Sequence, residues 1–153
     1  MISQLVPEKI SPETRSRMMA GIRGGNTKPE RLVRSGLHAA GFRFRLHRRG
    51  MPGRPDLVLP RWHVAVFVHG CFWHGHAGCP YFRVPKTRTV FWTDKISRNS
   101  KRDRAVEAAL RQLGWRVATV WECALRHDAN NVISQLVAFI QSAAPQIEIR
   151  HIR

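Results

Sequence analysis

The sequence predicts an α/β protein in which helices flank a mixed central sheet. Short apolar or alternating runs with strand character are interspersed with longer segments that carry helical start and stop signals, in the order α, α, β, β, β, α, β, α. The fourth strand follows the third through a helix, which favours a parallel, right-handed crossover between them. At 153 residues the chain has the length of one domain with its own hydrophobic core.

Two helices are expected near the N-terminus. Residues 1–11 carry no pattern and are expected to form a flexible arm. A helix over residues 11–22 begins with a serine cap and a proline at its first position. Thr27 and Glu30 then form a capping box for a second helix, which ends at Gly41. Glu30 therefore has a structural role available to it as a capping acid.

Three strands follow these helices. Residues 42–46 alternate apolar and basic side chains, which indicates a half-buried strand. A loop rich in Gly and Pro over 48–55 leads to Asp56, and residues 57–59 and 62–68 read as the next two strands. Asp56 therefore lies where an exposed loop enters the sheet, although a turn aspartate without further function is the common alternative.

The second half of the chain supplies the rest of the domain. A helix from position 93 or 94 to 113 is basic in its first half and apolar further along, and residues 115–121 form the fourth strand. Asp128 caps a last helix that ends before Pro145. We therefore expect a domain over 12–145 and a tail over 146–153.

The segment from 69 to 79 is the richest in chemical groups, with three histidines, two cysteines and an aromatic pair. Its Cys71, His76 and Cys79 are zinc-type ligands, but a closed structural zinc site needs four. Cys123 is the remaining cysteine and follows another strand, so strand pairing would complete a Cys3His set. The alternative is that the cysteines are small buried apolar residues. A disulfide framework is weakly supported because three cysteines are an odd number.

The formal net charge of +16 indicates a polyanionic partner, with nucleic acid ahead of an acidic protein or an anionic membrane surface. No apolar stretch approaches the ~20 residues that span a bilayer. The N-terminus shows no apolar signal segment, and a chain this basic is expected in the cytosol.

Four separated strings carry a resemblance to a known family. They are Pro-Gly-Arg-Pro-Asp at 52–56, His-Gly-Cys-Phe-Trp-His at 69–74, Lys-Thr-Arg at 86–88 and Trp-Glu-Cys-Ala-Leu-Arg at 121–126. In this order they resemble the very short patch repair DNA mismatch endonucleases, over about residues 12–141. The resemblance implies a restriction-endonuclease-like core with a structural zinc. It also implies an enzyme that uses magnesium to nick one strand of duplex DNA at a T:G mismatch.

The resemblance also assigns residues to roles. Asp56 and the backbone carbonyl of Val68 match the magnesium ligands. The matching active-site residues are Glu30, His69, His74 and Asp103. The matching zinc ligands are Cys71, His76, Cys79 and Cys123. The side chains that match a DNA wedge are Met19, Phe72 and Trp73. The expected DNA contacts are Asn99, Lys86 and Arg88.

Several alternatives stay open at this point. Either His69 or His74 is suited to accept a proton from water, with Glu30 stabilising the imidazolium. A related nuclease of a restriction or defence system would share this chemistry but act on a different target, and a zinc-stabilised DNA-binding module would lack catalysis. The expected partner is double-stranded DNA with a T:G mismatch, and other repair factors are expected as further partners. The protein is expected to be a monomer. It is expected at the nucleoid in the bacterial cytoplasm.

Overall fold

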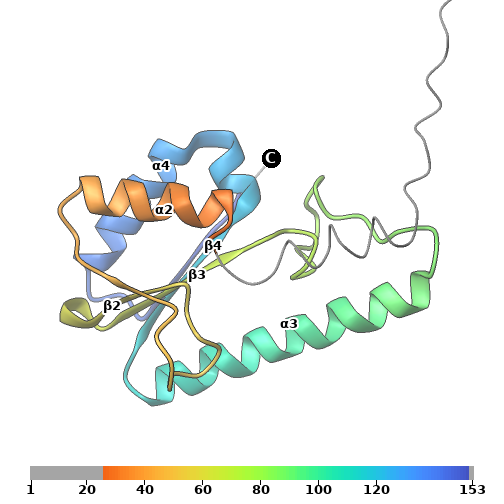
Figure 1. The fold of residues 1–153 in the computed structure, drawn as a ribbon, viewed down its shortest axis with the longest axis horizontal. Coiled ribbons are helices and arrows are strands. Elements are labelled where there is room, and N and C mark those ends of the chain that lie inside the picture. The colour runs from red at the N-terminus through yellow and green to blue at the C-terminus, as the bar shows by residue number, and fades with distance from the viewer. Residues whose placement is uncertain (1–25, 152–153) are drawn as a thin grey trace, which may run out of the picture.

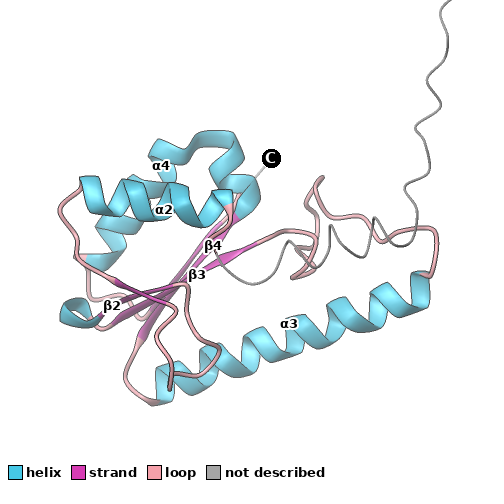
Figure 2. Ribbon diagram, viewed as in Figure 1, coloured by secondary structure: helices cyan, strands magenta, loops and turns pink. Residues whose placement is uncertain are grey.

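The computed structural model describes residues 26–151, which form five strands, three α-helices and one short 3-10 helix (Figures 1 and 2). The strands are β1 (Arg45–Leu46), β2 (Leu57–Leu59), β3 (Val64–His69), β4 (Arg116–Trp121) and β5 (Gln146–Ile149). They lie in the order β1-β2-β3-β4-β5, antiparallel up to β3 and parallel from β3 to β5. The expected mixed α/β architecture is confirmed, and so is the parallel pairing of the two strands that a helix connects.

Helices cover both faces of this sheet. On one face lie α2 (Lys28–Ala39) and α4 (Glu122–Ile140), and on the other lies α3 (Thr89–Gln112) (Figure 1). Strand β3 packs against the helices on both faces of the sheet. Val64 and Val66 join the core beneath α2 and α4, and Ala65 packs with Leu110 of α3. This alternation follows from the two-residue period of a strand.

Local signals account for the start of α2. The hydroxyl of Thr27 accepts a hydrogen bond from the Glu30 backbone at 3.3 Å, and the Glu30 carboxylate accepts one from the Asn26 backbone at 2.8 Å. These two hydrogen bonds form the reciprocal pattern of a capping box, except that Glu30 binds the backbone N–H of Asn26 instead of that of Thr27. The expected helix over 11–22 lies outside the described residues.

Three element boundaries differ from the sequence predictions. Strand β1 has only two residues, because just Arg45 and Leu46 pair with β2, opposite Val58 and Leu57. Helix α3 begins at Thr89 rather than at position 93 or 94, and the left-handed residue Arg88 precedes it. Helix α4 begins directly after β4, and its expected cap Asp128 lies inside it as a kink. The Asp128 carboxylate still accepts a hydrogen bond from the Asn131 backbone at 3.0 Å, as a helix cap does.

The segment for which we expected a tail contains β5. This strand pairs in parallel with β4, from Val117 opposite Gln146 to Val120 opposite Ile149, and Ile149 is buried. Arg116 secures the preceding turn, because its guanidinium donates to the carbonyl oxygens of Phe139, Ile140, Ser142 and Trp62 at 2.8 to 3.0 Å. The domain therefore continues past Pro145. Within residues 26–151, no helix combines the length and apolarity needed to cross a bilayer.

Candidate active site and metal centre

Asp56 lies at the start of β2, beside the end of β3 in the antiparallel pair. Its Oδ2 accepts a hydrogen bond of 2.7 Å from the backbone N–H of Val68. Burial raises the pKa of Asp56 to about 7, and nearby Glu30 also raises it, against the lowering effects of that hydrogen bond and of His74. A carboxylate that loses so much hydration is one that a bound cation would stabilise. This donor chemistry fits a magnesium ion held by Asp56.

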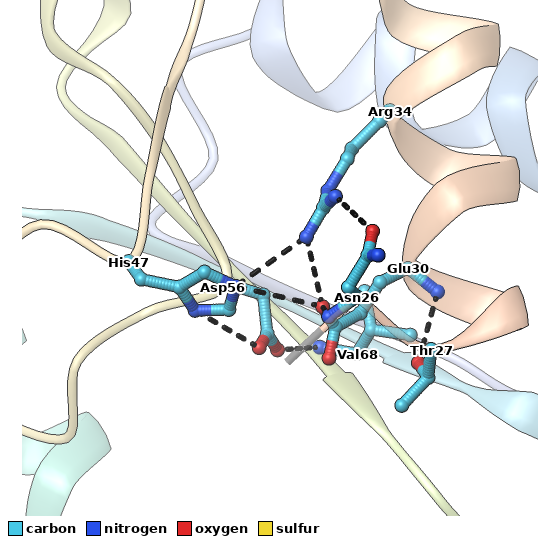
Figure 3. Close-up of polar contacts among 7 residues, drawn as sticks. All are labelled: Asn26, Thr27, Glu30, Arg34, His47, Asp56 and Val68. Atoms are coloured by element: carbon cyan, nitrogen blue, oxygen red, sulfur yellow. Dashed lines mark hydrogen bonds and ion pairs between the residues drawn. The ribbon is translucent and has the colours of Figure 1, made fainter. Parts of the chain in front are cut away.

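A second acid and two basic side chains surround Asp56 (Figure 3). Glu30 is buried and pairs with Arg34 at 3.1 Å. His47 lies between the two acids, with Nε2 at 3.6 Å from Glu30 Oε2 and Nδ1 at 3.9 Å from Asp56 Oδ1. The ligand-type atoms of Glu30, His47 and Asp56 all lie within 4.8 Å of one another. Sequence reasoning missed His47 and Arg34.

The histidines predicted for catalysis lie together near the end of β3. The rings of His69 and His74 stack with centroids 3.8 Å apart and an angle of 2° between their planes. His74 Nδ1 lies 2.6 Å from Asp103 Oδ2 of α3. Glu30 was suggested as the carboxylate that stabilises an imidazolium here, but the structure places it beside Arg34 and His47, and places Asp103 beside His74.

His69 differs from His74 in its environment. It is 8% exposed, and its Nδ1 has no hydrogen-bond partner among the described residues. Burial, and then the charge of His74, lower the pKa of His69 to about 3. The buried ring is therefore neutral at physiological pH. Both histidines line a cavity of about 450 Å³ between the sheet and α3.

Helix α3 also holds the loop that carries these residues. Asn99 Nδ2 donates to the Trp73 carbonyl at 3.0 Å, and Ser100 Oγ donates to the His74 carbonyl at 2.9 Å. The Asn99 carbonyl oxygen accepts a hydrogen bond of 2.5 Å from Arg102. Asn99 was predicted to contact DNA, but here both ends of its amide bind other groups of the protein.

The structure brings Cys71, His76, Cys79 and Cys123 together, with one potential ligand atom of each within 4.8 Å of the others. All four are buried. Ligand atoms around a tetrahedral zinc ion, with bonds of about 2.3 Å to sulfur, are separated by roughly 3.8 Å, so the observed spacing fits a closed Cys3His site. Burial raises the thiol pKa of Cys71 and of Cys123 and lowers the pKa of His76. A bound cation would stabilise the thiolates in this buried position.

Aromatic side chains project from the same loop and from the start of α3. Phe72 and Trp73 contact each other with centroids 5.1 Å apart, and Trp92 contacts both at 5.6 and 5.9 Å. These three rings are half-buried, Phe91 beside them is 40% exposed, and Lys95 Nζ lies 5.6 Å from the Trp73 ring. We call these five residues the aromatic cluster. Sequence reasoning missed Trp92, although the Phe91-Trp92 pair in a polar stretch was a usable signal.

The remaining predicted DNA-binding residues lie around this cluster or outside the described chain. Lys86 and Arg88 are exposed in the segment before α3, and the Arg88 guanidinium lies 4.3 Å from the centre of the Phe91 ring. Met19, predicted as part of the wedge, lies outside the described residues. The segment that carries Lys86 and Arg88 is therefore next to the aromatic cluster, and Arg88 contacts it at Phe91.

Sequence comparisons identify relatives of this chain. A family model described as DNA mismatch endonuclease Vsr matches residues 8–79. The type II nicking enzyme V.XorIIP of Xanthomonas oryzae pv. oryzae is 52% identical over 118 residues, which is 77% of this chain and 86% of the relative. The DNA mismatch endonuclease Vsr of Escherichia coli K12 is 48% identical over 113 residues, or 74% of this chain and 72% of the relative. The type II nicking enzyme V.NmeAIP of Neisseria meningitidis is 42% identical over 131 residues, or 84% and 93%.

Proposed function

Because the chain belongs to the DNA mismatch endonuclease Vsr family, we propose that it nicks one strand of duplex DNA at a T:G mismatch. Membership of this family makes it a DNA nicking endonuclease. The finer proposal is that the reaction is magnesium-dependent hydrolysis of a phosphodiester bond. We also propose that the five-stranded sheet and its helices form a restriction-endonuclease-like core.

One observation carries the catalytic proposal, namely the meeting of the buried acid Asp56 and a stacked pair of histidines at the end of β3. Val68 donates to Asp56, and the next residue, His69, stacks on His74. Val68 and His69 thus connect the carboxylate that would hold a cation to the histidine pair, in which His74 would accept a proton. In a DNA-binding module without catalysis, this arrangement of an acid and two histidines would have no function.

In the proposed mechanism Asp56 and the carbonyl of Val68 would hold the magnesium ion. When bound, the ion would neutralise charge at the phosphate and make water more acidic. His74 is the proposed general base, because hydrogen bonding of Nδ1 to Asp103 leaves Nε2 free to accept the proton of water. His69, which is neutral and buried, holds the His74 ring by stacking.

The zinc is proposed to be structural. Its proposed ligands are Cys71, His76, Cys79 and Cys123. The ion would join the loop after β3 to Cys123, which lies two residues after the end of β4. The same loop carries His74, so the metal would hold catalytic groups and the aromatic cluster in one rigid segment.

The aromatic cluster is the proposed wedge for mismatch recognition. Apolar side chains inserted between base steps cost a few kcal/mol of unstacking, and a mismatched step is easier to open. Exposed cations, among them Lys86 and Arg88, would bind the phosphates on either side. Selectivity would then follow from how readily the DNA opens. Met19 is proposed as a further wedge residue by resemblance alone.

A second candidate differs only in its target. Two of the relatives described above are named type II nicking enzymes. Their names favour a nicking enzyme that shares this chemistry but serves a restriction system with its own sequence context. In either case we propose a monomer that acts on DNA in the bacterial cytoplasm at the nucleoid, with other repair factors as further partners.

Cleavage mapping on a panel of duplexes tests the proposal. The full-length protein is incubated with magnesium and with T:G-mismatched or matched duplexes of varied flanking sequence. We expect one nick, in one strand, on the mismatched duplexes only. Asp56→Asn should abolish nicking while binding to the mismatched duplex persists. Equal nicking of matched DNA in a defined sequence would favour the second candidate, and binding without any nicking would contradict both.

A further inference from the structure

The space between His47 and Asp56 has the width of a cation site (Figure 3). His47 Nδ1 and Asp56 Oδ1 are 3.9 Å apart, which is too long for a hydrogen bond. Two ligand atoms that are each about 2.1 Å from one ion are at most about 4.2 Å apart. A single ion between these two atoms therefore satisfies both without a large movement of either side chain.

The other nitrogen of the His47 ring faces an acid, Glu30. His47 Nε2 lies 3.6 Å from Glu30 Oε2 and 3.4 Å from Arg34 Nη2. Histidines that bind metals usually present the second ring nitrogen to a carboxylate, which fixes the ring. Glu30 is itself held by Arg34 at 3.1 Å. When Nδ1 binds a cation the proton of the ring is on Nε2, where Glu30 is the group that can accept it, and Arg34 acts by holding Glu30.

We propose that His47 is a ligand of the catalytic cation, so that the site combines oxygen donors with one imidazole nitrogen and binds Mn²⁺ in preference to Mg²⁺. This inference rests on the proposed function, because it concerns the cation that Asp56 would hold for DNA cleavage. Carboxylate, carbonyl and water oxygens suit Mg²⁺, whereas imidazole raises the affinity for first-row transition metals. Glu30 then acts as a positioning residue for His47, beyond its role in capping α2.

Binding of Mn²⁺ to the zinc-loaded, full-length protein without DNA tests this inference. The wild type, His47→Gln and His38→Gln are titrated with Mn²⁺ while electron paramagnetic resonance reports the free ion, and the titrations are repeated in competition with Mg²⁺. His38→Gln is the matched control, because His38 is exposed at the end of α2 and outside the site. Zinc content and thermal unfolding establish that each variant is folded.

We expect the wild type and His38→Gln to bind Mn²⁺ more tightly than Mg²⁺. His47→Gln should lose about tenfold or more in Mn²⁺ affinity, since loss of even an outer-shell partner costs ~10–100-fold, and should change little in Mg²⁺ affinity. The nicking rate with Mn²⁺ relative to Mg²⁺ should fall in the same variant. Equal Mn²⁺ affinity in His47→Gln and the wild type would overturn the inference.

Two further readouts separate this inference from the proposed function. Pulsed electron paramagnetic resonance of Mn²⁺ bound to the wild type should show coupling to a ¹⁴N nucleus, and its absence overturns the inference even if His47→Gln does not fold. A wild type that nicks DNA but shows no such coupling leaves the proposed function standing. A protein with nitrogen-coupled Mn²⁺ and no nicking of any duplex contradicts the proposed function alone.

Discussion

The indole Nε1 of Trp121 donates a hydrogen bond of 2.8 Å to Glu148 Oε1. The Trp121 ring stacks on the proposed zinc ligand His76, with centroids 4.0 Å apart, and meets His69 edge to face at 5.2 Å. Trp121 therefore separates the cysteine cluster from the stacked histidines and contacts both. Its orientation depends on β5, the strand that follows Pro145.

Loss of this hydrogen bond should loosen the proposed zinc site. We expect Glu148→Ala to lower stability by about 1 kcal/mol, as for a typical lost hydrogen bond, and to speed zinc release to a chelator. Glu148→Gln keeps an acceptor for the indole and should behave as the wild type. Release rates that are identical in all three proteins would show that Trp121 is held without Glu148.

Removal of a proposed zinc ligand should prevent stable folding. Cys123 is buried and belongs to a cluster that joins two distant parts of the chain, so Cys123→Ser should lose zinc and expose apolar surface. Metal analysis and thermal unfolding measure the effect. Tyr81→Ala is the control, because Tyr81 is exposed near the same loop and offers no ligand. A folded wild-type preparation without zinc would contradict a structural role for the metal.

The elements that the sequence predicted well have strong local signals. Residues 57–59 are a short apolar run before a proline, and Thr27 begins a helix with a capping box; both appear in the structure at those positions. Strand β5 has no such signal. Its four residues are one short apolar alternation, and β4 supplies its pairing.

The candidate site was predictable where residue chemistry is unusual. Three cysteines with one histidine are a ligand set that zinc prefers, and the fold brings one potential ligand atom of each within 4.8 Å of the others. His47 was missed because it lies next to several arginines, in a stretch whose polar side chains were all expected to be exposed to solvent. The partner of His74 was also misjudged, since only the packing of α3 against the loop after β3 places Asp103 beside it.

Asp103 should matter to the rate more than to the fold. Asp103→Asn keeps the size of the side chain but no longer stabilises an imidazolium at His74, so nicking at saturating DNA should fall. The expected loss is in the ~10²–10⁴-fold range of general acid–base catalysis, and His74→Ala should fall in the same range. Single-turnover nicking measures both. Asp94→Asn, an exposed acid earlier on α3, should leave the rate unchanged. An equal loss in Asp94→Asn would point to DNA binding rather than catalysis.

Glu30→Gln should affect both stability and rate. The amide still offers an oxygen to the Asn26 backbone, but the charge facing Arg34 is lost. Because both side chains are largely buried, we expect a loss of about 1–3 kcal/mol in the free energy of unfolding. Urea unfolding measures this loss, and nicking should fall less than in Asp103→Asn. A variant with unchanged stability and abolished nicking would show that Glu30 acts in the chemistry alone.

Trp73→Ala should reduce preference for the mismatch without disturbing the fold. Trp73 is half-buried against Phe72 and Trp92, and Lys95 lies over its ring, so neither the core nor the zinc cluster depends on it. If the aromatic cluster enters the duplex, the Trp73 ring contacts the bases and offsets the cost of unstacking them. These contacts form mainly at the mismatched step, because that step opens most readily. The ratio of nicking rates on T:G and matched duplexes should therefore fall toward one, and Trp92→Ala should act in the same direction. Tyr81→Ala removes an exposed aromatic outside the cluster and should leave the ratio unchanged. If Trp73→Ala and Trp92→Ala retain zinc, fold normally and keep the wild-type ratio, the aromatic cluster is not the wedge and recognition lies in another part of the chain.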